Sequence, residues 1–190
     1  MSPKPVHIAQ ISDLHIKPPG SLAYGKVDTA KALERCVAAL NEFDPAPDFV
    51  VISGDLADTP MVEEYQYLKR LLAPLKLPFA SVPGNHDSRE LMRAAYPSSS
   101  YAFASGPLNQ KIEVNGLDLM LLDSSVHGKP HGELEESTLQ WLDAMLAAEP
   151  AGLVFEGRRI EVTVEFAVDA QQQVLVEARA EPFAVVVGGD

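Results

Sequence analysis

Three short clusters of acidic, histidine and amide side chains stand in the first half of the chain, and each follows an apolar run. They are Asp13-Leu14-His15, Gly54-Asp55-Leu56-Ala57-Asp58 and Gly84-Asn85-His86-Asp87. Carboxylates, imidazoles and amide oxygens are ligands that manganese, iron and zinc accept in proteins. Together the clusters predict a metal site of the kind that hydrolyses phosphate esters.

The spacing within the clusters predicts a role for each side chain. Asp13 and His15 are two residues apart, so in extended chain they point to the same side and can bind one ion. Asp55 follows a glycine that allows close backbone approach, and its carboxylate can bridge two ions. Asn85 offers a carbonyl oxygen to a second ion, and His86 is predicted to stabilise the transition state or protonate the leaving alkoxide. The predicted metal ligands are therefore Asp13, His15, Asp55 and Asn85, with His86 as the catalytic residue.

Asp58 and Asp87 are expected to support the site rather than to bind metal. Each can accept hydrogen bonds that hold a loop or an imidazole in place. Taken singly, each cluster also has an ordinary explanation, such as a turn that enters a helix or a helix cap. The occurrence of all three, each after a predicted strand, favours the metal site.

Strand and helix patterns alternate through the first hundred residues. Apolar runs predict buried strands at residues 6–11, 49–52 and 79–82. A helical pattern follows each of these strands. The first helix is capped by Asp28 or Thr29, the second is opened by Thr59-Pro60, and the third is a short helix at 88–96. The second of these helices carries Tyr65, Leu68, Leu71 and Leu72. In such α/β sheets ligands collect at the carboxyl ends of the strands, where all three clusters fall.

The second half of the chain predicts more sheet. Residues 110–114 and 117–122 read as a hairpin around Asn115-Gly116, and 137–146 have helical spacing. Alternating residues from 160 to 168, near 174–176 and at 183–187 predict further strands. The expected fold is α/β: a layered β-sandwich flanked by helices, with C-terminal strands. Residues 1–150 are predicted to form the domain, and 151–190 a β-strand tail that completes its sheet.

Composition limits the partners. The 190 residues, 46% of them apolar, fit one domain of ordinary size. A formal charge of −12 disfavours nucleic acid, because a long polyanion would be repelled. A small phosphodiester remains an acceptable substrate, because bound divalent ions would offset the local negative charge.

A cytoplasmic location is expected. Cys36 is the only cysteine, so an intramolecular disulfide is excluded and a reducing compartment is indicated. The first ten residues lack the apolar segment of a secretory signal, and no run approaches the ~18 apolar residues of a membrane span. We therefore expect no membrane association.

The order of the clusters resembles that of the calcineurin-like metallophosphoesterases, whose pattern is Asp-x-His, Gly-Asp-x-x-Asp and Gly-Asn-His-Asp/Glu. The segments 11–15, 82–87 and 122–124 are similar to the bacterial cyclic-nucleotide phosphodiesterase branch. The likeness continues through Gly132-Glu133-Leu134 to Trp141-Leu142 and covers about residues 5 to 149. The resemblance implies a dinuclear iron, manganese or zinc centre that activates a bridging hydroxide for attack on phosphorus. It also implies a 3′,5′-cyclic nucleotide phosphodiesterase.

One departure from the family pattern leaves alternatives open. Family members continue with a histidine after the next strand and then a Gly-His-x-His motif, whereas this chain has no histidine beyond His131. His127 and His131 are spare imidazoles that fit surface positions or substitute ligands. The alternative to a hydrolase is a truncated, fused or redesigned scaffold without catalysis that binds at most one weak ion. A third option is that another subunit or a missing segment completes the site, and the tail strands could pair two chains in a homodimer.

Overall fold

Two β-sheets lie face to face in the structure, a computed structural model that describes residues 5–126, 128–148, 160–164, 176–178 and 183–188. The first sheet has the order β3-β2-β1-β6-β7, with parallel pairing except between β6 and β7. Its strands are β1 (Val6–Ile11), β2 (Phe49–Ser53), β3 (Phe79–Val82), β6 (Ile160–Val164) and β7 (Val176–Ala178).

The second sheet has the order β4-β5-β8. The strands β4 (Gln110–Val114) and β5 (Leu117–Asp123) are antiparallel, and β8 (Phe183–Gly188) pairs in parallel with β5. Apolar side chains from β1, β2 and β3 meet those of β4 and β5 between the sheets, namely Val6, Ile8, Phe49, Val51, Ala80, Val82, Val114, Leu117, Leu119 and Leu121. The predicted α/β class and layered sandwich are confirmed.

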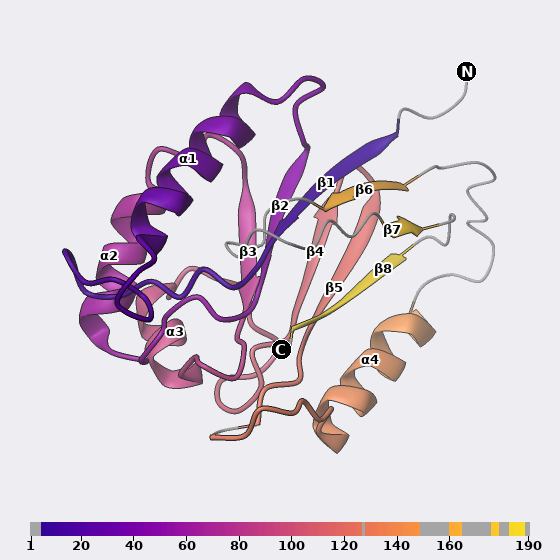
Figure 1. The fold of residues 1–190 in the computed structure, drawn as a ribbon. Coiled ribbons are helices and arrows are strands. Elements are labelled where there is room, and N and C mark those ends of the chain that lie inside the picture. Colours follow the sequence, from indigo (N-terminus) through magenta and orange to yellow (C-terminus); the bar gives the residue numbers. More distant parts are fainter. Residues whose placement is uncertain (1–4, 127, 149–159, 165–175, 179–182, 189–190) are drawn as a thin grey trace.

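Three helices cover the outer face of the first sheet: α1 (Thr29–Glu42), α2 (Val62–Leu72) and α3 (Arg89–Ala95). Successive residues of a strand point to opposite faces, so Val50 and Ile52 of β2 pack against these helices while Val51 faces the other sheet. The fourth helix, α4 (Glu136–Ala148), lies beside the second sheet (Figure 1). Among the helices described, none is long and apolar enough to cross a membrane.

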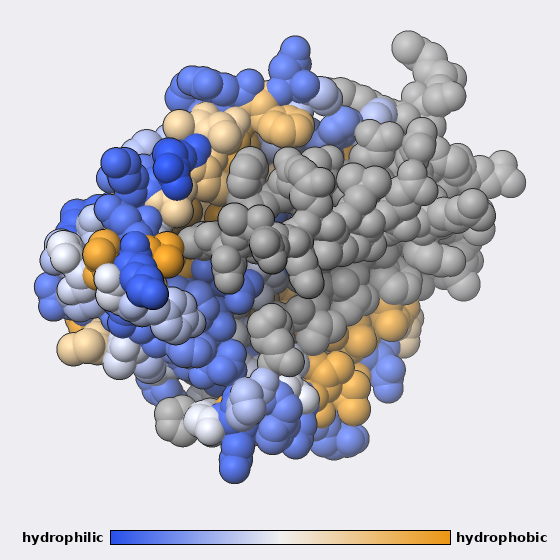
Figure 2. Space-filling model, in the orientation of Figure 1, coloured by the Kyte–Doolittle hydropathy of each residue, from blue (hydrophilic) through white to orange (hydrophobic). Residues whose placement is uncertain are grey.

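The surface over the helices differs between the two sides of the molecule. Figure 2 shows hydrophilic side chains over much of α1 and α2, and hydrophobic side chains gathered over α4. Only Thr138 of α4 is fully buried. This helix therefore contributes less to the core of the described residues than α1 and α2 do.

Most element boundaries agree with the sequence patterns, and the exceptions have local causes. Asp28, not Thr29, caps α1, because its side chain accepts a hydrogen bond from the Lys31 N–H at 3.0 Å. Helix α2 begins at Val62 rather than at Pro60, because Glu64 accepts hydrogen bonds from two backbone N–H groups ahead of the helix.

The C-terminal strands join both sheets. Strand β6 pairs in parallel with β1, and β8 pairs with β5. Of the strand predicted over 160–168, residues 160–164 are a strand and the rest lies outside the described residues, as does residue 174. The division of the chain at residue 150 stays a prediction.

Cys36 is expected to be unreactive in the native protein. It is buried in α1, and burial raises the pKa of its thiol to about 11. Because the thiolate is the nucleophile, we expect labelling by a disulfide reagent at pH 8 to be ~100-fold slower than in guanidinium chloride. The rate of thionitrobenzoate release measures this difference, and equal rates in the two conditions would contradict the buried placement.

Candidate metal centre

The loops that follow β1 and β2 run side by side beyond the ends of their strands. Three backbone hydrogen bonds continue the pairing, from Asp13 N to Gly54 O at 3.2 Å, His15 N to Asp55 O at 2.9 Å and Ile16 N to Leu56 O at 3.0 Å. The first two clusters are therefore aligned by main-chain contacts. The third cluster follows β3, the neighbour of β2 in the same sheet.

Three residues of these loops have left-handed backbone conformations. The φ angles are 56° at Asp13, 40° at His15 and 49° at Asp55. This region is unfavourable for side chains other than glycine, and less so for aspartate than for most residues. Such strain persists where the surroundings impose it, and it clusters at functional sites. Here it coincides with three of the four predicted metal ligands.

Imidazole and carboxylate groups converge at the ends of the strands. His15 Nε2 lies 3.6 Å from Asp55 Oδ2 and 4.0 Å from Asp13 Oδ1. The His86 ring stands edge-on to the His15 ring, with the two centroids 4.8 Å apart. Ligand atoms of His15, Asp55 and His86 all lie within 4.8 Å of one another. In the part of the chain that the structure describes, this is the cluster whose spacing suits a metal ion.

Asp58 contacts both imidazoles from behind. Its carbonyl oxygen is 2.8 Å from His86 Nδ1, and its Oδ1 is 3.5 Å from His15 Nδ1. A carbonyl only accepts, so His86 Nδ1 carries the hydrogen of this bond, and Nε2 is the ring nitrogen left for an ion or a substrate. Partial burial raises the pKa of the Asp58 carboxyl, but the hydrogen bond and charge of Lys17 outweigh it and lower the pKa below its usual value. Asp58 is therefore a stable carboxylate beside the two rings.

Gly84 allows the second and third clusters to meet. A Cβ atom there would lie 2.2 Å from Asp55 Oδ1 and 2.3 Å from the Asp55 backbone nitrogen. At this position only glycine fits. The close contact also lets the His86 N–H donate to Asp55 Oδ1 at 2.9 Å. The close approach to Asp55 is therefore made by Gly84, while the one that the sequence assigned to Gly54 stays a prediction.

Asp87 holds two loops together, as expected for a supporting residue. Its carboxylate accepts hydrogen bonds from three backbone N–H groups and from the Tyr65 hydroxyl, at 2.8 to 3.1 Å. Burial raises the pKa of the Asp87 carboxyl, while these four hydrogen bonds favour its charged form. The Tyr65 oxygen in turn accepts a hydrogen bond from the Ser88 N–H at 2.9 Å. The donors on the main chain are Leu56, Ala57 and Gly84.

The other candidate residues lie around this centre. The Asp13 side chain is 40% exposed, and Asn85 is half-buried next to His86. His131 is exposed and pairs with Glu133 at 3.2 Å, away from the cluster of three. His127 lies outside the described residues.

Sequence reasoning missed several supporting contacts. Tyr65 read only as an apolar position of a helix, yet its hydroxyl binds Asp87. Lys17 stood in a proline-rich loop and contacts Asp58 across 41 residues of sequence. Arg89, which pairs with Asp123 at 2.8 Å, also had no predicted role. The sequence did indicate that this arginine lies near the site, because it stands two residues after Asp87 of the third cluster.

The donor set fits a divalent metal ion. Two imidazoles and a carboxylate are ligands that zinc, iron and manganese share, and Asp13 adds a further carboxylate within reach of His15.

Residues 6–155 match the family model for calcineurin-like phosphoesterases. The chain belongs to this family. The resemblance inferred from the three clusters is therefore confirmed, and the calcineurin-like phosphoesterase match contains all of them. It also contains β1 to β5 and the four helices.

Several curated relatives of the chain are named as phosphodiesterases. A probable glycerophosphodiester phosphodiesterase, GpdQ, of Arcobacter nitrofigilis is 38% identical over 75% of this chain and 52% of its own length. The 3′,5′-cyclic adenosine monophosphate phosphodiesterase CpdA of Escherichia coli is 32% identical over 76% of this chain and 51% of its own length. A cAMP/cGMP dual specificity phosphodiesterase of Mycobacterium tuberculosis is 34% identical over 76% of this chain and 46% of its own length. The chain spans about half the length of these relatives.

Proposed function

We propose that this chain is a metal-dependent hydrolase of small phosphodiesters, with 3′,5′-cyclic nucleotides as the expected substrates. The convergence of His15, Asp55 and His86 within 4.8 Å carries this proposal. The names of the relatives support it, since they include cyclic nucleotide and glycerophosphodiester phosphodiesterases.

Asp13, His15, Asp55 and Asn85 would hold one or two divalent ions of manganese, iron or zinc. When bound, such ions supply a Lewis acid for a phosphoryl oxygen and lower the pKa of water. Asp58 would orient His15, since a carboxylate behind a ligating imidazole fixes the ring. The Asp55 carboxylate would remain positioned by the hydrogen bond from the His86 N–H.

His86 is proposed to deliver a proton to the leaving alkoxide. Its Nδ1–H is held by the Asp58 carbonyl, so the imidazolium form would give the alkoxide its second proton, from Nε2. If His86 bound an ion instead, the neutral form would use the Nε2 lone pair. The two roles exclude each other at a given moment, and a substitution separates them.

A second candidate is a scaffold without catalysis that binds at most one weak ion. The observation that favours it is the lack of any histidine after His131, together with the exposed ion pair of His131 with Glu133. A homodimer in which a second subunit completes the site is the related option. The single cysteine supports a reducing compartment, and we propose the cytoplasm.

Metal content and turnover test these candidates together. A two-metal hydrolase should hold close to two ions per chain by elemental analysis and should hydrolyse bis(4-nitrophenyl) phosphate. Removal of the metal by a chelator should abolish turnover, and manganese, zinc or iron should restore it. At most one loosely held ion with background turnover would support the scaffold instead.

The variant His86→Gln resolves the role of this residue. If His86 is the proton donor, the substitution should lower turnover by about 10² to 10⁴-fold and leave the metal content unchanged. Loss of bound metal in the same variant would identify His86 as a ligand. His131→Gln is the matched control, because His131 is exposed and lies outside the cluster. Equal effects of the two substitutions would count against any role of His86.

A further inference from the structure

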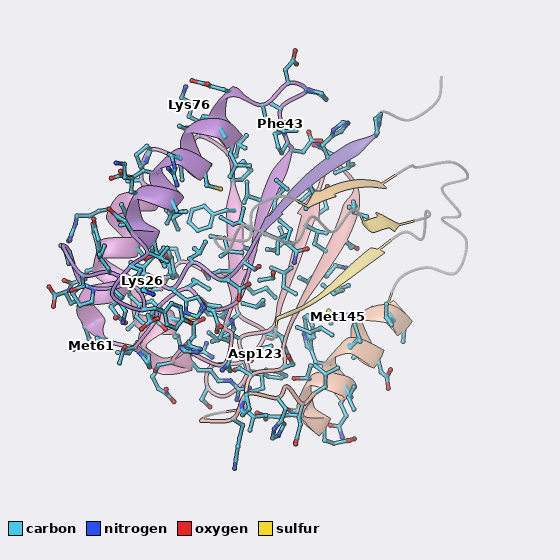
Figure 3. All side chains as sticks on the ribbon, in the orientation of Figure 1. Lys26, Phe43, Met61, Lys76, Asp123 and Met145 are labelled. Atoms are coloured by element: carbon cyan, nitrogen blue, oxygen red, sulfur yellow. The ribbon has the colours of Figure 1, made fainter. Side chains whose placement is uncertain are left out.

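The third cluster is anchored to both sheets of the molecule. On the side of the first sheet, the Asp87 carboxylate binds main-chain N–H groups of the loop after β2. On the side of the second sheet the anchor is Arg89, the first residue of α3, whose guanidinium reaches the end of β5. Figure 3 shows Asp123 at that end, between α3 and α4. The loop that carries the third cluster is therefore held from two directions.

Arg89 uses all three of its guanidinium nitrogens. Nε lies 2.8 Å from Asp123 Oδ2, and Nη2 donates to Asp123 Oδ1 at 3.2 Å. Nη2 also donates to the Ser125 carbonyl at 2.8 Å, and Nη1 donates to Glu135 Oε1 at 2.7 Å. Because two carboxylates already balance its single charge, Arg89 is not placed to bind a substrate anion. Its contacts instead join the third cluster to the segment that follows β5.

The residue to which Arg89 binds is itself fixed in the core. Asp123 is fully buried and accepts hydrogen bonds from the Leu108 N–H at 2.8 Å and from the Ser125 N–H and hydroxyl at 2.9 and 2.7 Å. Its own N–H donates to Asn109 Oδ1 at 2.8 Å, and Asn109 Nδ2 donates to Thr138 Oγ1 of α4 at 2.9 Å. A buried network whose members have their partners is rigid. The third cluster is therefore tied to a rigid part of the second sheet.

Asn85 lies next to this joint. Asn85, Arg89 and Ser125 line one pocket of about 150 Å³. Among the residues that the structure describes, the Asn85 side chain has no hydrogen-bond partner, so its amide is free to bind an ion but is not held by a direct hydrogen bond. A ligand side chain must stay within about 0.5 Å of its productive position, which requires support from its surroundings. The loop of the third cluster and the walls of this pocket supply that support.

We propose that Arg89 is a positioning residue for the second ion. By holding the Ser125 segment against the third cluster, it keeps the Asn85 amide oxygen within reach of that ion. This inference rests on the proposed hydrolase function with two ions bound. The first ion depends on Arg89 less, because Asp13 and His15 lie in the loop after β1, whose main-chain hydrogen bonds go to the loop after β2. Loss of Arg89 should therefore weaken one of the two ions selectively.

Calorimetric titration of the metal-free full chain with manganese tests this role. In Arg89→Met we expect the affinity for one ion to fall about 10- to 100-fold, as for other residues that support a metal ligand, and the affinity for the other ion to stay the same. Turnover should then need more manganese to reach half its maximum, while kcat at saturating manganese approaches that of the unsubstituted chain. Urea denaturation of the same metal-free samples establishes that the variant is folded.

Arg93→Met is the matched control. Arg93 belongs to the same helix and also binds main-chain carbonyls, those of Phe103 at 2.7 Å and Gly106 at 3.3 Å, but it does not line the pocket next to Asn85. Its loss should lower the stability of the fold without changing either affinity. A merely structural effect of Arg89 would give the same pattern as this control.

Arg89→Lys keeps the test decisive if Arg89→Met fails to fold. Lysine retains a positive charge for the buried Asp123 carboxylate. Its single ammonium group lacks the planar fork that binds Asp123 and the Ser125 carbonyl together, so the affinity for the same ion should still fall, by less than in Arg89→Met.

A double-substitution cycle shows whether Arg89 acts through Asn85. Asn85→Ala should weaken the same ion as Arg89→Met does. In the chain that carries both substitutions, the affinity for this ion should be little lower than in Asn85→Ala alone, because the side chain that Arg89 positions is already absent. Fully additive losses would show that Arg89 acts independently of Asn85 and would overturn the positioning role.

The outcomes separate this inference from the function beneath it. Two ions bound as tightly in both Arg89 variants as in the unsubstituted chain would overturn the positioning role alone. Equal weakening of both ions would also overturn it, since it would indicate a general loss of structure. An unsubstituted chain that binds one ion or none would overturn the function with two ions bound, and with it the second ion that Arg89 is proposed to position.

Discussion

Replacing Asp87 with alanine is expected to lower the free energy of unfolding by about 4 kcal/mol. Asp87 is 8% exposed, and its carboxylate satisfies four donors. Its loss therefore leaves the Tyr65 hydroxyl and three main-chain N–H groups buried without an acceptor. Each such group costs about 1 to 3 kcal/mol, and entry of water recovers part of the total. Urea denaturation of the metal-free protein measures the change without a contribution from bound ions.

Tyr65→Phe is the matched control for this prediction. It removes one of the four donors to Asp87 and the acceptor of the Ser88 N–H while it keeps the ring packed, so its expected cost is about 2 kcal/mol. Asp87→Asn should lie between the two, because the amide oxygen still accepts while its NH₂ group faces backbone donors. If Asp87→Ala were no more destabilising than Tyr65→Phe, the four-donor arrangement would be wrong.

Replacing Asp55 with alanine is expected to remove tight metal binding and to lower phosphodiester turnover at least ~10³-fold. Asp55 is the carboxylate of the three-residue cluster, and its Oδ2 lies 3.6 Å from His15 Nε2. Without it, His15, Asn85 and the more exposed Asp13 remain of the four proposed ligands. Calorimetric titration with manganese or zinc measures the affinity, and the nitrophenyl ester assay measures turnover.

Asp55→Asn separates the charge of this residue from its geometry. The amide retains an oxygen that can accept from the His86 N–H, and asparagine tolerates the left-handed backbone that Asp55 adopts. We therefore expect near-normal stability in the metal-free state but much weaker metal binding. Two tightly bound ions in Asp55→Ala would show that the centre lies elsewhere.

The sequence predicted where the site lies better than how it is supported. Apolar runs that end at polar clusters placed Asp13, Asp55 and Asn85 at neighbouring strand ends, because parallel strands end at one edge. The contacts that fix these residues depend on tertiary packing. Tyr65 reaches Asp87 only because α2 packs against the first sheet, and Lys17 reaches Asp58 only because two loops are aligned by main-chain hydrogen bonds. Neither pairing has a local pattern in the sequence.

The roles of the glycines, too, could be predicted from the sequence only in part. Gly54 could be given a role from its place before Asp55, and it does adopt a φ of 112°. The constraint at Gly84 arises because its backbone lies against Asp55, which is distant in sequence. Contacts of this kind follow from the register of β2 and β3, which composition and periodicity do not determine.

The left-handed backbone at Asp13, His15 and Asp55 sets stability against function in this protein. Each such residue costs of order 1 to 3 kcal/mol, and the cost is present whether or not an ion is bound. Glycine at Asp13 or His15 would relieve this strain in the metal-free fold, while it removed a ligand; at Asp55 it would also remove the acceptor of the His86 N–H. A library selected only for thermal resistance should therefore drift away from the ligand side chains, and one selected for metal-dependent turnover should keep them. At this centre, substitutions that raise the stability of the fold are expected to lower metal binding and turnover.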